Sequence, residues 1–335
     1  MIYLRKYNNF IIERRGVATE TIKYSDVVLG VTKKYFLEFL KTNDIQFDEV
    51  IELKKDQFPF YNENYPISEI ELEISFNRMP DDAFSKRFST IYAKGKYFTT
   101  TGACYAIGEG GSEKLDDESI RLKMSVGAII DIEKFNVSYV EDIYLELYSA
   151  LTHEFNHSYE GYHRDKKGAP GMGTALTFSL DPNVAEVPEN VWDIWWKELG
   201  YYLYWTESFE LNAMIQDAFP YASKYSFEEM KEKTPSWDFY QRMMKFDPIE
   251  FKSRLSVEIE KSMPGENPDD VLTRMKDGLA KKLEESLSED EGETSSIDPK
   301  LIRKLNIDQF LEYCNRRIKK GSERLRRGII KHYSK

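Results

Sequence analysis

The sequence predicts an α+β fold in which a small sheet occupies the first part of the chain and helices dominate the rest. Two stretches before residue 130 alternate apolar and polar residues with the period of two that is typical of a half-buried strand. At about residue 138 the apolar period becomes that of a helix. From residue 191 onward, helical patterns continue without strand-like alternation.

The elements of the first part can be placed one by one. Ser25 can cap a helix that extends to about Thr42. Apolar residues alternate with charged or polar ones in 70–76 and again in 120–126, which predicts two strands. A Lys-Gly-Lys sequence at 94–96 is typical of a hairpin turn between two short strands. The first 130 residues therefore predict one helix and several strands.

A longer helix is expected immediately afterwards. Ser138 and Glu141 form the S-x-x-E capping box that starts many helices. Apolar residues follow at helical spacing, namely Val140, Ile143, Leu147 and Leu151. Gly161 is a natural stop for a helix. We therefore expect this helix to cover about 139–160.

The composition argues against several classes of protein. Of the 335 residues, 41% are hydrophobic and 14% aromatic, which predicts a globular chain with a sizeable core. No apolar run approaches the roughly 18–20 residues of a membrane span, and the N-terminus lacks the features of a signal peptide. The two cysteines, Cys104 and Cys314, form no CxxC motif and predict no disulfide framework. A cytoplasmic location is the simplest expectation.

Charge is unevenly distributed along a chain whose net charge is −11. The acidic excess argues against bulk attraction to nucleic acid. From 284 to 298 there are seven acids and no base, whereas 300–335 contains 12 bases and three acids. The expected regions are an α+β subdomain (1–165), a helical subdomain (166–285), an acidic linker (286–299) and a basic C-terminal helix (300–335). We expect the last to dock on the acidic body or on a protein partner.

One motif carries recognisable chemistry. His153-Glu154-Phe155-Asn156-His157 reads H-E-x-x-H and lies on the helix expected over 139–160. Four residues bring a helix back to nearly the same face, so His153 and His157 can bind one tetrahedral zinc ion. Glu154 is then placed to take a proton from water on the metal, as a general base does. Two ordinary surface histidines are the alternative.

The motif resembles that of the H-E-x-x-H zinc metallopeptidases and is most similar to the gluzincins, whose third ligand is a glutamate on a later helix. Glu210 has the expected setting, because Ala213 places a small residue one turn later, where two helices would pack closely. Glu207, one turn earlier, remains an alternative ligand. The resemblance covers about 120–215 together with the preceding strands, and it implies Zn²⁺ as cofactor and a peptide or protein as substrate. The lack of a long apolar run predicts no membrane partner.

The resemblance also implies an order of elements. Gluzincins place a mixed sheet before the motif helix, and an edge strand of that sheet pairs with extended substrate. The stretch 119–126, just ahead of the motif helix, is the candidate for this edge strand. Such pairing would supply main-chain hydrogen bonds with little sequence specificity. An interior strand with no substrate role is the alternative.

Two other zinc-enzyme patterns match less well. His163 stands where metzincins have a third histidine, but Glu160 occupies the position of their glycine and Gly161 comes one residue late. Peptide deformylases pair an upstream cysteine with H-E-x-x-H. The surroundings of Cys104 read TGACYA, however, and lack the E-G-C-L motif of that family.

The segment before Glu210 is unusually aromatic and is expected to contribute mainly to the core. Tyr204 is the candidate there for a hydroxyl that stabilises the oxyanion of a tetrahedral intermediate. The expected function is therefore that of a zinc metallopeptidase. A non-enzymatic binding or assembly protein with a structural zinc site and a basic docking helix is the alternative.

Overall fold

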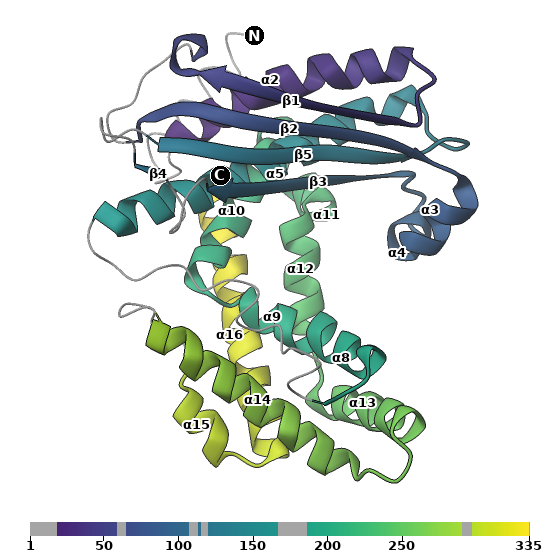
Figure 1. The fold of residues 1–335 in the computed structure, drawn as a ribbon, viewed down its shortest axis with the longest axis vertical. Coiled ribbons are helices and arrows are strands. Elements are labelled where there is room, and N and C mark those ends of the chain that lie inside the picture. Colours follow the sequence, from purple (N-terminus) through teal and green to yellow (C-terminus); the bar gives the residue numbers. More distant parts are fainter. Residues whose placement is uncertain are drawn as a thin grey trace. The chain divides into compact units, whose positions relative to one another are not determined.

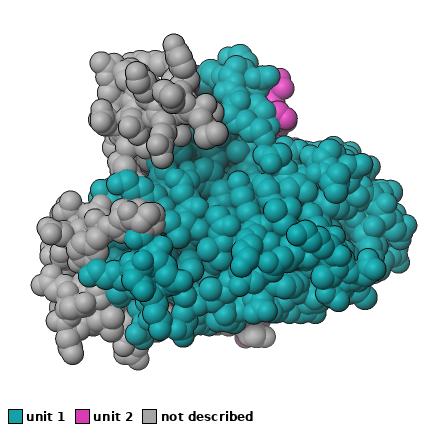
Figure 2. All heavy atoms as spheres, turned by 90° about the horizontal axis from the view of Figure 1, so that it is seen from above, with its two compact units in different colours: residues 1–163, 216–230 teal, residues 164–215, 231–335 magenta. Residues whose placement is uncertain are grey.

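The computed structural model describes residues 19–58, 65–106, 113–114, 120–166, 186–289 and 297–334. The chain divides into two compact units (Figure 2). Unit 1 comprises residues 1–163 and 216–230, and unit 2 comprises residues 164–215 and 231–335. The boundary at 163 falls close to the one expected at 165, but residues 216–230 return to unit 1, and the basic C-terminal segment belongs to unit 2.

Unit 1 is built on a mixed sheet with the strand order β1-β2-β5-β3 (Figure 1). Its strands are β1 (Gln46–Lys54), β2 (Ile67–Met79), β3 (Phe98–Ala106), β4 (Glu113–Lys114) and β5 (Ile120–Asp131). β2 runs parallel to β5, whereas the pairs β1–β2, β3–β5 and β4–β5 are antiparallel. The expected small mixed sheet is therefore confirmed.

The alternation in β2 and β5 separates the two faces of this sheet. The apolar side chains of both strands are buried beneath α2 (Thr19–Lys41) and α5 (Val140–Lys166), which lie on the same side of the sheet (Figure 1). The opposite face carries a ladder of charges. Arg121 lies 3.2 Å from Glu69, and Lys123 bridges Glu71 and Glu73 at 2.9 and 2.6 Å. Burial of one face therefore fixes the register of both strands.

The expectation that 119–126 forms an edge strand is wrong. Residues 120–126 belong to β5, which pairs with β2 on one side and with β3 and β4 on the other. The near-continuous burial of Val126, Gly127 and Ala128 is typical of an interior strand. Among the described strands, β1 and β3 form the two edges of the four-strand order.

The start of the chain differs from expectation in three places. α2 begins at Thr19, so Ser25 lies inside the helix, where its hydroxyl donates to the Thr21 carbonyl at 2.7 Å instead of capping. The stretch before Gly95 forms the short helices α3 (Asp81–Arg87) and α4 (Ser89–Tyr92) rather than the first strand of a hairpin. Gly95 does turn the chain, at a φ of 73° that favours glycine. β1, followed by the 3₁₀ turn η1 (Lys55–Gln57), was not expected.

The motif helix α5 is longer than the sequence predicts. It follows a 3₁₀ turn, η2 (Val137–Tyr139), in which the Asn136 side chain accepts a hydrogen bond from the Ser138 amide. Asn136 thus caps the start, and Ser138 lies within the turn. The helix passes through Gly161 to Lys166, so that glycine is not its end. Tertiary packing of the apolar face overrides the weak local preference of a single glycine.

Unit 2 is helical throughout its described part, as expected for the second half of the chain. It contains α8 (Glu189–Trp195), the π-helical turn η3 (Trp196–Gly200), α9 (Tyr201–Tyr204), the start of α10 (Ser208–Lys224), the end of α11 (Phe227–Lys233), α12 (Pro235–Met244), α13 (Pro248–Ser262), α14 (Pro268–Glu289), α15 (Pro299–Lys304) and α16 (Ile307–Tyr333). Trp195 stacks on Phe310 at a ring-centroid distance of 6.0 Å, which joins α8 to α16. In the described residues, no helix is both long and apolar enough to cross a bilayer.

The expected acidic linker is only partly visible. Residues 286–289 are the last of α14, and 290–296 lie outside the described residues. The following α15 and α16 bury apolar residues within unit 2, among them Ile302, Phe310, Ile318, Leu325 and Ile329. The basic segment is therefore an integral part of the helical unit.

Candidate metal centre

The two motif histidines lie on one face of α5, as their spacing predicts. His153 and His157 are half-buried, and their Nε2 atoms are 2.9 Å apart. The rings meet edge to face, with centroids 4.5 Å apart and an interplanar angle of 81°. Two imidazole nitrogens therefore face the same small volume, which is the arrangement that a shared metal ion requires.

Asp217 orients the first of these histidines. Its Oδ1 atom lies 3.0 Å from His153 Nδ1, and its backbone carbonyl accepts a 3.1 Å hydrogen bond from Ser149 Oγ. Both contacts join α10 to α5 within unit 1. A carboxylate beside Nδ1 favours a proton there, and the Nε2 lone pair is then available to a metal.

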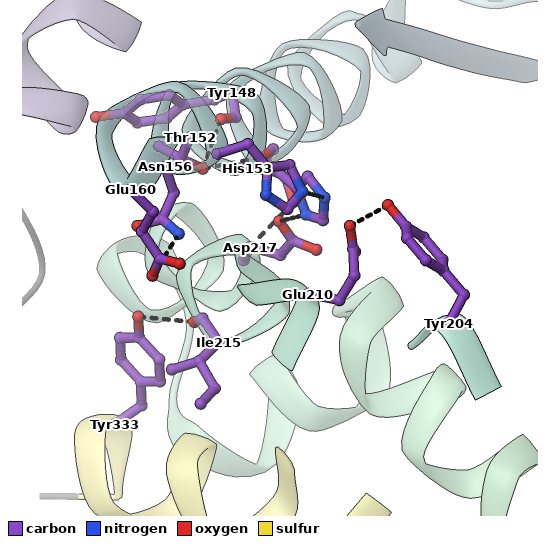
Figure 3. Close-up of polar contacts among 12 residues, drawn as sticks. Tyr148, Thr152, His153, Asn156, Glu160, Tyr204, Glu210, Ile215, Asp217 and Tyr333 are labelled. Carbon is purple, nitrogen blue, oxygen red and sulfur yellow. Dashed lines mark hydrogen bonds and ion pairs between the residues drawn. The ribbon is translucent and has the colours of Figure 1, made fainter. Parts of the chain in front are cut away.

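Glu210 is the third residue of the group and lies on α10, the helix that also carries Asp217. It lies seven residues before Asp217 on the same helix, so both side chains project from nearly the same face. His153, His157 and Glu210 each offer one ligand atom, and these three atoms lie within 4.8 Å of one another. Figure 3 shows Glu210 and Asp217 directed toward His153. These three residues could hold a metal ion.

The spacing of the three residues is compatible with tetrahedral zinc. Bonds of roughly 2.0–2.1 Å would place ligand atoms about 3.4 Å apart. The histidine nitrogens, at 2.9 Å, are slightly closer than this, and the 4.8 Å limit of the whole group is slightly wider. Small side-chain rotations would therefore suffice. Glu210 is only 3% exposed, so a cation beside it would compensate a buried carboxylate.

Tyr204 lies beside the glutamate rather than apart from it. Its hydroxyl donates a hydrogen bond to Glu210 Oε1 (Figure 3). A carboxylate has two oxygens, so Glu210 can keep this hydrogen bond on one of them while the other binds a metal. The structure thus brings Tyr204 to the candidate metal centre, where its hydroxyl contacts a candidate ligand.

Glu154 follows His153 on α5 and is half-buried. It is not one of the three grouped residues, and its expected role as a general base remains a prediction. Its position next to His153 on the same helical turn is set by the backbone of α5.

The structure separates the alternative ligands from this group. Glu207 is 7% exposed and forms an ion pair with Arg317 Nη2 at 2.8 Å. His163 lies six residues after His157 on the same unbroken helix, about 9 Å further along its axis. The glycine turn that brings a third histidine to the metal in metzincins is therefore replaced by continuous helix. Cys104 lies in β3, but its side chain is outside the described part of the structure.

Several titratable groups near the centre have raised pKa values. Burial raises the pKa of the Tyr201 hydroxyl, and the neighbouring Glu210 carboxylate raises it further. Burial likewise raises the pKa of Tyr221, with added effects of the Glu146 and Asp217 carboxylates. The pKa of Glu146 is itself raised by burial, and its carboxylate is held by Lys96 at 2.6 Å.

Sequence reasoning missed Asp217. Its signal is its spacing, because a carboxylate seven residues after Glu210 falls on the same face of a helix two turns later. The ion pair between Glu207 and Arg317, 110 residues apart, has no comparable local signal. Searches of family models, curated proteins and solved structures find no match to this chain.

Proposed function

We propose that this chain is a zinc-dependent metallopeptidase of the gluzincin type. The observation that carries the proposal is the grouping of His153, His157 and Glu210, with the first of them oriented by Asp217. An accidental cluster of surface residues would not need a carboxylate behind one imidazole. Such carboxylate–histidine pairs are typical of metal sites, where they fix the tautomer of the ligand.

The chemistry divides between the ion and the chain. A bound zinc ion supplies Lewis-acid polarisation of a carbonyl and lowers the pKa of water. Glu154 accepts a proton from the attacking water and later delivers it to the leaving amine. Tyr204 donates its one hydroxyl proton to Glu210. Release of that hydrogen bond would make the proton available to a developing oxyanion.

The sheet offers a place for an extended substrate next to the motif helix. With β5 in the interior, β3 takes the role of the edge strand. It lies tightly against α5, since a Cβ at Gly102 would come within 2.8 Å of Ala150 Cβ. Among the described residues, no strand pairs with the outer side of β3. We therefore assign peptide binding by strand addition to β3.

The ligand count bears on the non-enzymatic alternative. Structural zinc sites usually have four protein ligands, whereas catalytic sites have three and leave a position open. Among the residues that the structure describes, the group contains three. This supports catalysis over a purely structural site. The expected cytoplasmic location remains a prediction.

Removal of the base tests the proposal. Glu154→Gln should bind zinc as the wild type does, because it changes no ligand, while hydrolysis of peptides falls about 100- to 10,000-fold. Glu141→Gln, an exposed change in the first turn of α5, is the matched control and should retain full activity. Unchanged hydrolysis by Glu154→Gln would exclude the proposed mechanism.

A further inference from the structure

The exposed face of α16 carries a row of basic side chains that the candidate metal centre does not use. We call it the basic face, and its members are Arg316, Lys319, Lys320, Arg324, Arg327 and Lys331. All six are exposed. At 100° per residue they fall within about 140° of the helix circumference. They form one continuous strip rather than a scatter of charges around the helix.

The basic face is not neutralised by neighbouring acids. Within the part of the chain that the structure describes, Arg316 reaches Glu312 only at 4.0 Å, and the other five members form no ion pair with a carboxylate. Glu323 lies within the strip, but Arg326 engages it at 3.1 Å. Elsewhere in unit 2, several surface cations have close acidic partners, as in Lys197–Asp193, Arg242–Asp238, Lys252–Asp308, Arg274–Glu266 and Arg303–Glu284. Exposed cations without an ion pair among the described residues, such as Lys245, Lys300 and Lys304, occur there singly on other segments and form no strip.

This contrast is informative because acids are in excess in this protein. With 58 acidic and 47 basic residues, partners for six cations are available in the composition. Like charges on successive turns of a helix repel one another, so the strip costs some stability. An external anion would remove that repulsion.

The basic face is also held rigidly. The opposite side of α16 is buried, and Gly321 lies so close to Thr206 that a Cβ would come within 2.6 Å of its methyl group. Arg317, which is half-buried at the edge of the strip, pairs with Glu207 just before α10 begins. A helix fixed in this way presents its charges in a set geometry, which lowers the entropy lost on binding.

We propose that the basic face binds an acidic segment of the peptide substrate, away from the bond that is cleaved. This inference rests on the proposed peptidase function. From Arg316 to Lys331 the strip is about 22 Å long, which corresponds to about seven residues of extended chain. The preferred substrates are therefore proteins that carry a run of roughly seven residues rich in Asp and Glu.

An acidic peptide fits the surroundings better than nucleic acid does. The chain outside 300–335 has a net charge of −20 by sequence, and this field opposes a long polyanion more than a short one. Single-stranded nucleic acid also needs aromatic platforms for its bases. Of the two tyrosines of α16, Tyr333 is buried, whereas Tyr313 is half-buried and lies one turn before Arg316 on the same side of the helix. The strip therefore has one partly exposed ring at its start and no series of rings along its length.

Binding can be measured without turnover. The probe is a fluorescein-labelled eight-residue peptide containing six glutamates, titrated with the full-length protein in fluorescence anisotropy at low salt. Lys319→Gln/Lys320→Gln/Arg324→Gln should weaken binding about tenfold or more, because three nearby charges are lost. Lys197→Gln/Lys261→Gln/Lys281→Gln removes three exposed charges elsewhere in unit 2 and should leave affinity unchanged.

The outcomes separate this inference from the peptidase proposal. Equal affinity of both triple variants, or tighter binding of an eight-nucleotide single strand than of the peptide, would overturn it. An acidic tail added to a peptide that the protein hydrolyses should lower the KM of that peptide and leave its kcat unchanged. An unchanged KM would overturn substrate recruitment by the basic face. If no peptide is hydrolysed but the acidic probe still binds through the basic face, the peptidase proposal fails while the binding surface stands.

Discussion

Asp217 Oδ1 lies 3.0 Å from His153 Nδ1 and ties the C-terminal part of α10 to the motif helix. This contact makes Asp217 the support of a metal ligand rather than a ligand. Asp217→Ala should weaken zinc binding by about 10- to 100-fold, the usual effect of losing such a partner. Asp217→Asn keeps an acceptor and should lose less. Competition with a chelator measures both, and equal zinc affinity of wild type and Asp217→Ala would argue against this role.

Substitution of Glu210 should affect zinc binding, whereas substitution of Glu207 should affect stability. Glu210→Ala should lose most zinc affinity because it removes a ligand. Glu207→Ala should keep zinc but lower the free energy of unfolding by about 3 kcal/mol, since it leaves Arg317 partly buried without its carboxylate. Zinc titration and urea denaturation separate the two effects. His163→Ala should change neither, and loss of zinc in that variant would favour a metzincin-like centre.

Tyr204 has two candidate roles that kinetics can distinguish. If it only holds Glu210, Tyr204→Phe should reduce zinc affinity by about tenfold, and saturating zinc should restore kcat. If its hydroxyl stabilises the oxyanion, kcat should remain about 100-fold low even with zinc bound. We expect reduced zinc affinity in either case. Unchanged affinity and unchanged kcat would remove Tyr204 from the site.

The packing of α16 into unit 2 can be tested by stability. Phe310 is fully buried against Trp195, so Phe310→Ala should lower the free energy of unfolding by about 3–5 kcal/mol. Ile249→Ala is the control, because this side chain is 80% exposed and should change stability little. Equal unfolding midpoints in urea would show that α16 does not pack as described.

The reactivity of the Cys314 thiol provides a second test of the packing of α16. Cys314 is fully buried, and burial raises the pKa of its thiol, so the reactive thiolate is scarce in the folded state. In a Cys104→Ser background, a thiol reagent should modify native Cys314 very slowly and the urea-unfolded protein rapidly. Rapid modification of the native protein would contradict the burial of α16.

Much of this fold could be predicted from period and spacing. The alternation in β2 and β5 indicated two strands, and the motif spacing placed His153 and His157 on one helical face. Local signals misled where tertiary packing decided the outcome: Gly161 lies within α5, and Ser25 lies within α2. The neighbours of a strand cannot be read from its own residues, so the interior position of β5 required the structure.

In the candidate site, too, local patterns predicted some residues, and tertiary contacts decided the others. Glu210 was predicted from its local pattern, and the structure groups it with the histidines. The spacing of Asp217 from Glu210 places both on one face of α10. Sequence alone does not show that this face meets α5, so the contact of Asp217 with His153 could not be predicted. The sequence favoured Glu210 but left Glu207 open as an alternative, because the partner of Glu207, Arg317, is 110 residues away.

The metal content of the purified protein tests the central claim most directly. After dialysis against metal-free buffer and reconstitution with zinc, inductively coupled plasma mass spectrometry should find one zinc per wild-type chain. The variant His153→Ala/His157→Ala should retain less than a tenth of that amount, and Glu141→Gln should match the wild type. One zinc per chain in the double-histidine variant, or none in the wild type, would contradict a metal centre formed by His153, His157 and Glu210.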